Sequence, residues 1–498
     1  MTTATSHHSH SMAPPLPPTD SQPSSRPGPP PIRTNTQMLV DDGYLRVSQK
    51  LIEGLKKPEH PETLANILII ETGDKADHIH ISQRPDGQLY ARINGRDYAF
   101  NTFDGRSNVP TFLHIKTGAG DDRITLDPNV TVRVEIEAED GDDFVQAGGG
   151  PTSIYGGRGN DHIRLGSGIG YAEGNEGDDT IMGGTGHAVM YGNAGKDRLY
   201  AGSGPASKRS HLDGGADDDQ LYAGNGHTVL NGGRDKDLMV GYDQTTFYTG
   251  PGRDTVRANA LKARIYAQKT DRLIGTQGST ITHVTPTEAG RQAFKIIGPP
   301  DFIQRVEDDL ELLRASPAGQ KLLEALDKAA ERNGAPITLE NMPLPTNFIL
   351  FISTQLQAMS EEESNALEDF DPKQGFIKDG VAGAHMDQIK ILYNPSLINK
   401  IDNEVTVSPI VQLFHEMVHG WNASNGTLLP GLSAPTPDEP EHPGPPNFEL
   451  QAVGLPTDAP GFDFDNDPAT PPIATNPAPF TENSLHAEMG NPLRTRYA

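Results

Sequence analysis

The nine residues Gly156–Arg164, GGRGNDHIR, contain the pattern that decides the fold of the first half of the chain. Glycines permit a tight turn, Asp161 closes it, and the apolar Ile163 two positions later points into a core. Related segments recur at steps of 18, 18, 22, 18 and 18 residues, starting at Gly156, Gly174, Gly192, Gly214, Gly232 and, in degenerate form, Gly250. Looser copies start at Gly118 and Glu139. A period of 18 residues, made of two nine-residue turns, predicts a parallel β-roll or β-solenoid.

The first segment fits the pattern G-G-x-G-x-D-x-U-x throughout, where U is apolar. It thereby resembles the RTX repeats of secreted bacterial proteins, whose stacked turns hold calcium through carbonyl oxygens and aspartates. The resemblance implies calcium ligands at Asp161, Asp179, Asp197, Asp219 and Asp237. The alternate turns, such as LGSGIG and GGTGHA, lack aspartate, so we expect calcium on one side of the solenoid at most. The alternative is a glycine-turned solenoid with little or no calcium.

The composition limits the partners and the kinds of metal site. The 498 residues carry a formal charge of −26 and include no cysteine. So acidic a chain is unsuited to binding nucleic acid or an anionic membrane. Without cysteine it has neither disulfides nor thiolate zinc ligands. No apolar run approaches the roughly 18 residues of a membrane span, so we expect none.

A second motif lies in Ser408–Gly426, SPIVQLFHEMVHGWNASNG. The Ser-Pro start and the glycine at the end favour a helix over this segment. Residues four apart share one face of a helix, so His415 and His419 would direct two imidazoles at one point, with Glu416 beside them. This H-E-x-x-H arrangement suits a zinc ion held by two histidines and a carboxylate that takes a proton from water. The alternative is a buried core helix whose histidines are only hydrogen-bonded.

A third zinc ligand is expected downstream of this helix. Glu449 lies in NFELQAVGL, where Asn447 can cap a short helix, and a rigid platform positions a ligand better than a loop does. Four other candidates lie in the preceding proline-rich segment: Asp438, Glu439, Glu441 and His442. The chain ends with Arg494 and Tyr497 in an R-x-x-Y sequence, which is either a frayed terminus or a pair that stabilises an oxyanion at the zinc.

Three segments together, HEMVHGWN, ELQAVG and TEN…PLRTRY, resemble the M91 zinc peptidase family over about residues 295–498. The resemblance implies that His415, His419 and Glu449 are zinc ligands and that Glu416 is the catalytic base. The family includes a type III effector that cleaves host MAP kinases. The R-x-x-Y spacing also resembles clostridial neurotoxin light chains, which suggests Arg494 and Tyr497 as transition-state stabilisers.

We therefore predict a multidomain chain. Residues 1–37, rich in Ser, Thr, Pro and His, form a disordered segment and a candidate secretion signal. Residues 38–260 form the β-solenoid, and residues 261–294 a connector or cap. Residues 295–498 form an α+β zincin-type metallopeptidase domain with proline-rich loops at 428–446 and 456–479.

The predicted function is that of a secreted bacterial effector, a zinc endopeptidase that hydrolyses a host protein, with a MAP kinase as one candidate substrate. RTX proteins of type I export carry a signal at the C-terminus, which here holds R-x-x-Y, so we favour type III delivery into the host cell cytoplasm. The alternative is a calcium-binding, RTX-like adhesion protein with an inactive peptidase domain. Zinc content distinguishes the two.

Overall fold

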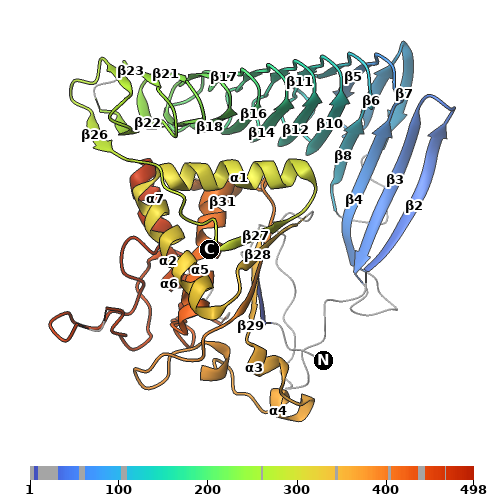
Figure 1. Cartoon of the computed structure of the whole chain (residues 1–498). Coiled ribbons are helices and arrows are strands. Elements are labelled where there is room, and N and C mark those ends of the chain that lie inside the picture. The colour runs from blue at the N-terminus through green and yellow to red at the C-terminus, as the bar shows by residue number, and fades with distance from the viewer. Residues whose placement is uncertain are drawn as a thin grey trace. The chain divides into compact units, whose positions relative to one another are not determined.

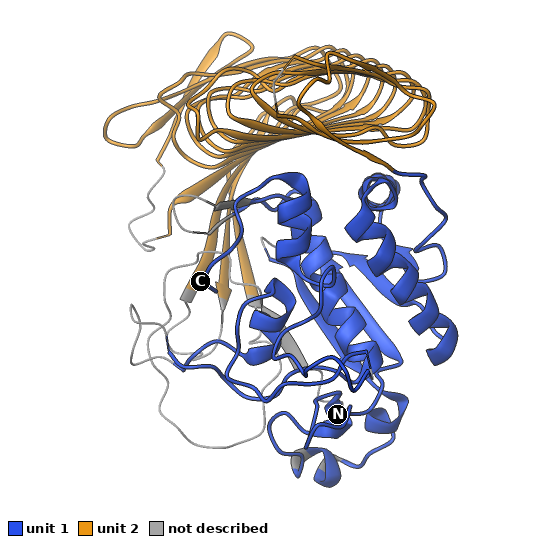
Figure 2. Cartoon of the chain, turned by 90° about the vertical axis from the view of Figure 1, so that its left-hand side faces the viewer, with its two compact units in different colours: residues 1–26, 284–498 blue, residues 27–283 orange. Residues whose placement is uncertain are grey.

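The computed structural model describes residues 5–8, 32–54, 62–101, 109–259, 262–342, 346–401, 405–435, 443–465 and 467–497. The chain divides into two compact units (Figure 2). One comprises Pro27–His283, and the other comprises Met1–Arg26 together with Val284–Ala498.

The first unit is a solenoid built from two long sheets (Figure 1). One sheet has the order β2 (Ile32–Asp41), β3 (Arg46–Gly54), β4 (Glu62–Glu71), β8 (Thr111–Lys116), β10 (Val134–Asp140), β12 (Thr152–Arg158), β14 (Gly170–Glu176), β16 (Ala188–Ala194), β18 (Arg209–Ala216), β20 (His227–Gly233), β22 (Gln244–Tyr248), β24 (Arg264–Ala267) and β26 (Thr280–His283). The other has the order β25 (Arg272–Ile274), β23 (Thr255–Ala258), β21 (Leu238–Gly241), β19 (Gln220–Tyr222), β17 (Arg198–Tyr200), β15 (Thr180–Met182), β13 (His162–Arg164), β11 (Phe144–Gln146), β9 (Arg123–Leu126), β5 (His78–Gln83), β6 (Leu89–Ile93) and β7 (Arg96–Phe100). β4 and β5 pair in parallel with β8 and β9, and from β8 onward each strand pairs in parallel with the strand one solenoid turn later.

The repeat period sets the register of the stack. Ile163 pairs with Ile181, and Ile181 with Leu199, so the apolar residue that follows each aspartate meets its equivalent one turn later. These residues are completely buried, as are Leu221 and Met239. Each such side chain contributes roughly 1.5–3 kcal/mol on burial. The parallel β-solenoid predicted from the repeats is confirmed.

The ends of the solenoid differ from the predicted limits. β2 begins at Ile32, inside the segment predicted to be disordered, and β2–β3–β4 and β5–β6–β7 are antiparallel hairpins. At the other end the parallel pairing continues to His283, well past residue 260. Glycine and aspartate fade there, but Ile265 still pairs with Ile281 in the same register. Apolar pairing thus outlasts the glycine–aspartate pattern that indicated the boundary.

The step of 22 residues comes from a longer turn between β17 and β18, which contains Lys208. The Lys208 side chain is buried, and its ammonium donates to the carbonyl oxygens of Gly184 (2.5 Å), Ala201 and Ser203 (3.5 Å). Burial lowers the pKa of Lys208 to about 8. In this turn, which has no aspartate ladder, a lysine therefore satisfies carbonyl oxygens as a bound cation would.

The second unit is an α+β fold around a sheet of order β1 (Thr5–His8), β29 (Phe348–Ile352), β30 (Gln388–Tyr393), β28 (Ile337–Asn341), β27 (Phe294–Ile297). Its helices are α1 (Pro300–Ala315), α2 (Pro317–Asn333), α3 (Thr354–Gln357), α4 (Glu361–Asn365), α5 (Pro409–Asn425), α6 (Asn447–Val453) and α7 (Glu482–Met489). A short 3₁₀ helix, η1 (Pro372–Gln374), and a hairpin of β31 (Asn399–Ile401) and β32 (Val405–Val407) complete it. No helix of the described residues is long and apolar enough to cross a membrane.

Helix α5 is the centre of this unit. It packs against α2, β29 and β30, and α6 and α7 also contact it. It begins after Ser408, as predicted, and ends at Gly426, whose φ of 67° lies in the left-handed region that glycine tolerates. Most of its side chains are buried on every face, which explains its high content of apolar residues.

Candidate metal and catalytic site

Two histidines of α5 and one glutamate of α6 bring three candidate metal-binding atoms together. The Nε2 atoms of His415 and His419 lie 3.0 Å apart. Glu449 Oε2 lies 3.3 Å from the first and 3.2 Å from the second. All three side chains are buried. The structure thus brings together the three residues that the sequence predicted as zinc ligands.

Hydrogen bonds at the start of α5 anchor the helix that carries the two histidines. Gln412 lies one turn before His415 and is buried. It accepts from the side-chain amide of Asn347 (3.1 Å) and donates to the carbonyl of Leu397 (2.6 Å). These contacts tie the helix to the chain around the sheet, so that the face carrying His415 and His419 is held toward α6.

Glu449 lies in the first turn of α6, and α6 is anchored to the chain that leaves α5. Gln451 accepts from the backbone N–H of Leu429 (3.0 Å) and donates to the carbonyl of Thr427 (2.9 Å). Leu429 and Thr427 both lie within a few residues of the end of α5. These hydrogen bonds therefore hold α6, which carries Glu449, in a fixed position relative to α5.

The predicted cap of α6 is wrong. Pro446 is the N-cap and makes no side-chain capping bond, whereas the Asn447 side chain donates to the carbonyl of Pro430 (2.7 Å). Asn447 still restrains the short helix, but by linking it to the preceding loop. The alternative third ligands lie outside the described residues: Asp438, Glu439, Glu441 and His442.

The three converging atoms fit a tetrahedral zinc ion. Zinc bonds of about 2.0–2.2 Å place neighbouring ligand atoms about 3.3–3.6 Å apart, close to the separations of 3.0–3.3 Å seen here. Burial lowers the pKa of His415, but hydrogen bonds to Glu449 and Glu482 outweigh burial and raise it to about 10. Surroundings that so strongly favour positive charge on His415 also favour a divalent cation at its Nε2.

Sequence reasoning missed Glu482, the first residue of α7. Its Oε2 accepts a hydrogen bond from His415 Nδ1 (2.9 Å) and another from Arg494 Nη1 (2.8 Å). Its Oε1 lies 3.2 Å from His486 Nε2. The available signal was the TEN of TEN…PLRTRY, in which Thr481 caps α7 and places this carboxylate in the first turn.

The C-terminal residues fold back toward the metal ligands. Arg494 is buried, and its Cζ lies 5.4 Å from the centre of the Tyr497 ring. Tyr497 packs against the apolar residues of α6 and the segment after it, including Leu450 and Val453. Burial and the nearby Glu449 carboxylate raise the pKa of Tyr497 well above its ordinary value, so its hydroxyl keeps its proton. The described part of the terminus is thus held in place and is not frayed.

In the solenoid, the predicted calcium ligands form a continuous ladder. The backbone N–H of Asp161 donates to Oδ1 of Asp179 (2.6 Å), and the same bond links Asp179 to Asp197, Asp197 to Asp219, and Asp219 to Asp237. All five are buried, and the second carboxylate oxygen of each has no hydrogen-bond partner within the described part of the chain. A buried carboxylate oxygen without a partner is costly, so these oxygens suit a hard cation such as calcium.

The ladder has more rungs than sequence reasoning assigned. The same bond joins Asp77 to Asp122, Asp122 to Asp143, Asp143 to Asp161, and Asp237 to Asp254. Asp122 and Asp143 lie in the looser copies of the repeat that start at Gly118 and Glu139, so the sequence contained a signal for both. Asp77 was hidden because 45 residues separate it from the next rung. The ladder is therefore a property of the stacked turns and is not confined to consensus repeats.

The ladder also explains the first glycine of each repeat. A Cβ atom on Gly156 would lie 2.1 Å from Oδ2 of Asp161 and 2.7 Å from the carbonyl oxygen of Gly174. The carboxylate therefore packs directly on the glycine Cα, and any side chain there would displace it.

Comparison with known families agrees with both geometries. Residues 290–497 match the M91 peptidase family. That family is described as an effector protein. Residues 137–171, 173–205 and 210–239 match the RTX calcium-binding nonapeptide repeat. Comparison with curated proteins and with solved structures found no match. The resemblances to M91 peptidases and to RTX repeats are thus confirmed.

Within the M91 region, Glu416 lies beside the ligand group and is buried. Burial raises the pKa of Glu416, and repulsion from Glu449 and Glu482 adds to this against the opposing charge of His415, so that the pKa is about 8. A carboxyl group with a pKa near neutrality can both accept and release a proton, which is what a general base requires.

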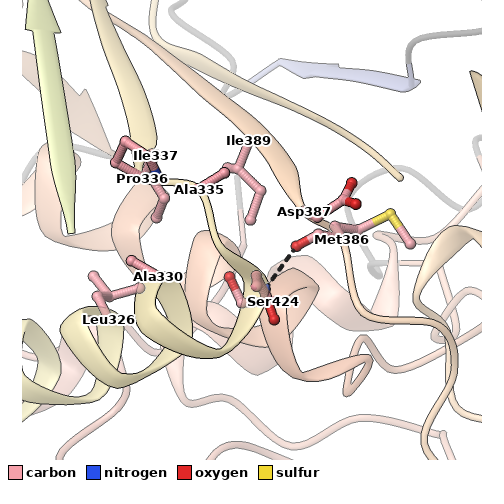
Figure 3. A pocket seen from close by; sticks show the side chains of 10 residues that line it. Leu326, Ala330, Ala335, Pro336, Ile337, Met386, Asp387, Ile389 and Ser424 are labelled. Carbon is pink, nitrogen blue, oxygen red and sulfur yellow. Dashed lines mark hydrogen bonds between the residues drawn. The ribbon is translucent and has the colours of Figure 1, made fainter. Parts of the chain in front are cut away.

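A pocket of about 10 Å³ also lies in the M91 region, at the C-terminal end of α5 (Figure 3). Ser424, five residues after His419, lines it together with Met386, whose carbonyl accepts from Asn333 Nδ2 (3.0 Å). A space of this size holds about one water molecule. It is too small for a peptide and does not compete with the histidine–glutamate group as the candidate site.

A second group of potential metal ligands lies on the solenoid. His114 Nε2 is 2.9 Å from Glu137 and 3.7 Å from Glu135. The ammonium group of Lys116 also pairs with Glu137. Because a lysine and a histidine already balance these partly exposed carboxylates, we interpret the group as an ion-pair network.

Proposed function

We propose that the chain is a secreted effector endopeptidase that uses zinc to hydrolyse a host protein. The observation that carries the proposal is the convergence of His415, His419 and Glu449, with Glu416 beside them, in the region that matches M91 peptidases. We further propose delivery into the host cytoplasm and name MAP kinases as the first substrates to test, because the family resemblance implies them.

In this mechanism, zinc held by His415, His419 and Glu449 would polarise a water molecule and the scissile carbonyl. Glu416 takes the proton of the attacking water and passes it to the leaving nitrogen. The Tyr497 hydroxyl, which keeps its proton, donates to the carbonyl oxygen as negative charge develops there. We retain Arg494 as a candidate stabiliser, although its observed partner is Glu482.

The proposed role of Tyr497 predicts a specific kinetic effect. Tyr497→Phe removes one hydrogen-bond donor to the oxyanion and should lower kcat by roughly 10²-fold with little change in KM. Steady-state kinetics on a cleaved peptide measures both constants. Arg496→Gln, an exposed change one residue earlier, serves as the control. Equal kcat values for Tyr497→Phe and wild type would remove Tyr497 from the mechanism.

We also propose that the aspartate ladder binds calcium, with Asp161, Asp179, Asp197, Asp219 and Asp237 as ligands. The buried Oδ2 atoms, for which the described residues supply no hydrogen-bond partner, and the match to RTX repeats support this proposal. They equally support the second candidate function, a calcium-dependent adhesion protein whose M91 region is inactive.

Proteolysis distinguishes the two functions. The purified chain should cleave members of a denatured-protein or peptide library, 1,10-phenanthroline should stop the cleavage, and added zinc should restore it. Purified MAP kinases form the second panel. No cleavage by zinc-loaded protein would favour the adhesion function, and cleavage that resists the chelator would contradict zinc dependence.

A further inference from the structure

We propose that Glu482 is a positioning residue that orients His415 toward the metal and links this ligand to the C-terminal segment through Arg494. The inference rests on the proposed zinc site and adds a residue to which the sequence motifs assign no role.

The contacts of Glu482 are short and enclosed. One oxygen, Oε2, accepts from both His415 Nδ1 (2.9 Å) and Arg494 Nη1 (2.8 Å). Glu482 is 1 % exposed, and both partners are buried. Charged hydrogen bonds in such surroundings are strong, and breaking one leaves a buried charge without compensation.

The contact determines which nitrogen of His415 can bind a metal. An ionised carboxylate only accepts, so His415 Nδ1 carries a hydrogen, and Nε2, beside Glu449, is the nitrogen left to bind a metal. Arg494, whose Nη1 donates to the same Oε2 at 2.8 Å, supplies a permanent positive charge beside this carboxylate.

The arrangement is asymmetric, which makes it testable. Nδ1 of His419 is buried and has no hydrogen-bond partner among the described residues. Glu482 therefore supports one ligand of the two. A general loosening of the domain would affect both histidines, whereas loss of Glu482 should affect the ring of His415 alone.

The C-terminal segment closes on this carboxylate through a second pair of bonds. The backbone N–H of Arg494 donates to Asn483 Oδ1 (2.8 Å), and Asn483 Nδ2 donates to the carbonyl of Arg494 (2.9 Å). Asn483 follows Glu482 in the first turn of α7. The position of Arg494 is thus set by α7, and zinc affinity should depend on a residue that contacts no metal ligand directly.

The experiment compares zinc dissociation constants by competition with a chromogenic chelator, using the full chain. Glu482→Met should raise the zinc Kd by roughly 10- to 100-fold. Glu482→Gln keeps an oxygen that accepts from Nδ1 and should show a smaller rise. The zinc Kd of Arg494→Met should lie between those of Glu482→Gln and wild type. Glu488→Gln, the same substitution on the same helix, where the carboxylate accepts from Ala318 N–H, should leave Kd unchanged.

Nitrogen NMR of the histidine rings gives a second readout. In the zinc-loaded chain, His415 of wild type and of Glu482→Gln should show a hydrogen-bonded Nδ1–H, and Glu482→Met should lose this hydrogen bond without changing His419. Equal Kd values for wild type, Glu482→Met and Glu482→Gln would overturn the inference alone. A wild-type chain that binds no zinc would overturn the proposed function and the inference with it.

Discussion

Glu416→Gln should lower kcat by roughly 10²- to 10⁴-fold while zinc remains bound, because the substitution removes the proton acceptor but no ligand. Glutamine has the shape of glutamate, and Glu416 lies beside the ligand group and is not part of it. Turnover of a cleaved peptide and the zinc content of the same preparation are measured together.

The control for Glu416→Gln is Glu488→Gln, which should keep wild-type kinetics. Variant kinetics within a few-fold of wild type would assign the base to another residue. Loss of zinc along with activity would show that Glu416 holds the metal site together and would leave its role as the base without support.

The second large effect is expected in the solenoid, whose stability without calcium should fall as pH rises. Burial raises the pKa of Asp179 to about 9, of Asp219 to about 10 and of Asp237 to about 9, whereas the ordinary value is 3.8. Above about pH 4 the unfolded chain has released these protons, whereas the folded chain still holds them. The free energy of unfolding therefore falls with each further pH unit, until the pH exceeds the pKa of these carboxyl groups in the folded chain.

The size of this effect follows from the linkage relation. One pKa unit corresponds to about 1.4 kcal/mol per group, so even one rung costs about 4 kcal/mol between pH 5 and pH 8. The unfolding midpoint of the calcium-free solenoid should therefore be lower at pH 8 than at pH 5 by at least about 10 °C. Calcium favours the ionised carboxylates and should remove most of the difference at pH 8. Thermal scans at both pH values, with calcium and with chelator, measure it.

Asp219→Asn isolates one rung of the ladder. Asparagine keeps an oxygen for the backbone N–H of Asp197 but carries no charge, so the calcium-free variant should be more stable than wild type at pH 8 and should gain less from calcium. The control is Asp86→Asn, an exposed substitution in the β5–β6 hairpin. It should change neither the calcium-free stability at pH 8 nor the stabilisation by calcium. Two outcomes would contradict the ladder as a cation site. One is a calcium-free unfolding midpoint that rises with pH, and the other is a midpoint that does not change when calcium is added.

Local patterns predicted the features that depend on short stretches of sequence. The 18-residue period predicted the solenoid and its inward side chains, because each turn repeats the same contacts. The four-residue spacing of His415 and His419 predicted a shared helix face, and the structure brings Glu449, the predicted third ligand, to the same point.

Features that depend on distant contacts were out of reach of the sequence. Glu482 is 67 residues from His415, and nothing in either segment specifies that the start of α7 meets α5 there. Asp77 joins the ladder across a step of 45 residues, which interrupts the 18-residue period. Asn447 has the right residue type for a helix cap, but its side-chain amide donates to the Pro430 carbonyl instead. In each case tertiary packing decided between locally acceptable arrangements.

The most direct test of this account is the zinc content of the purified full chain, measured beside His415→Ala after dialysis against calcium-free buffer. We expect about one zinc per chain in the wild type and none in the variant, because the variant lacks one of three ligands. A wild-type chain without zinc would contradict the zinc site on which the peptidase mechanism rests, and the calcium ladder would then be the functional part.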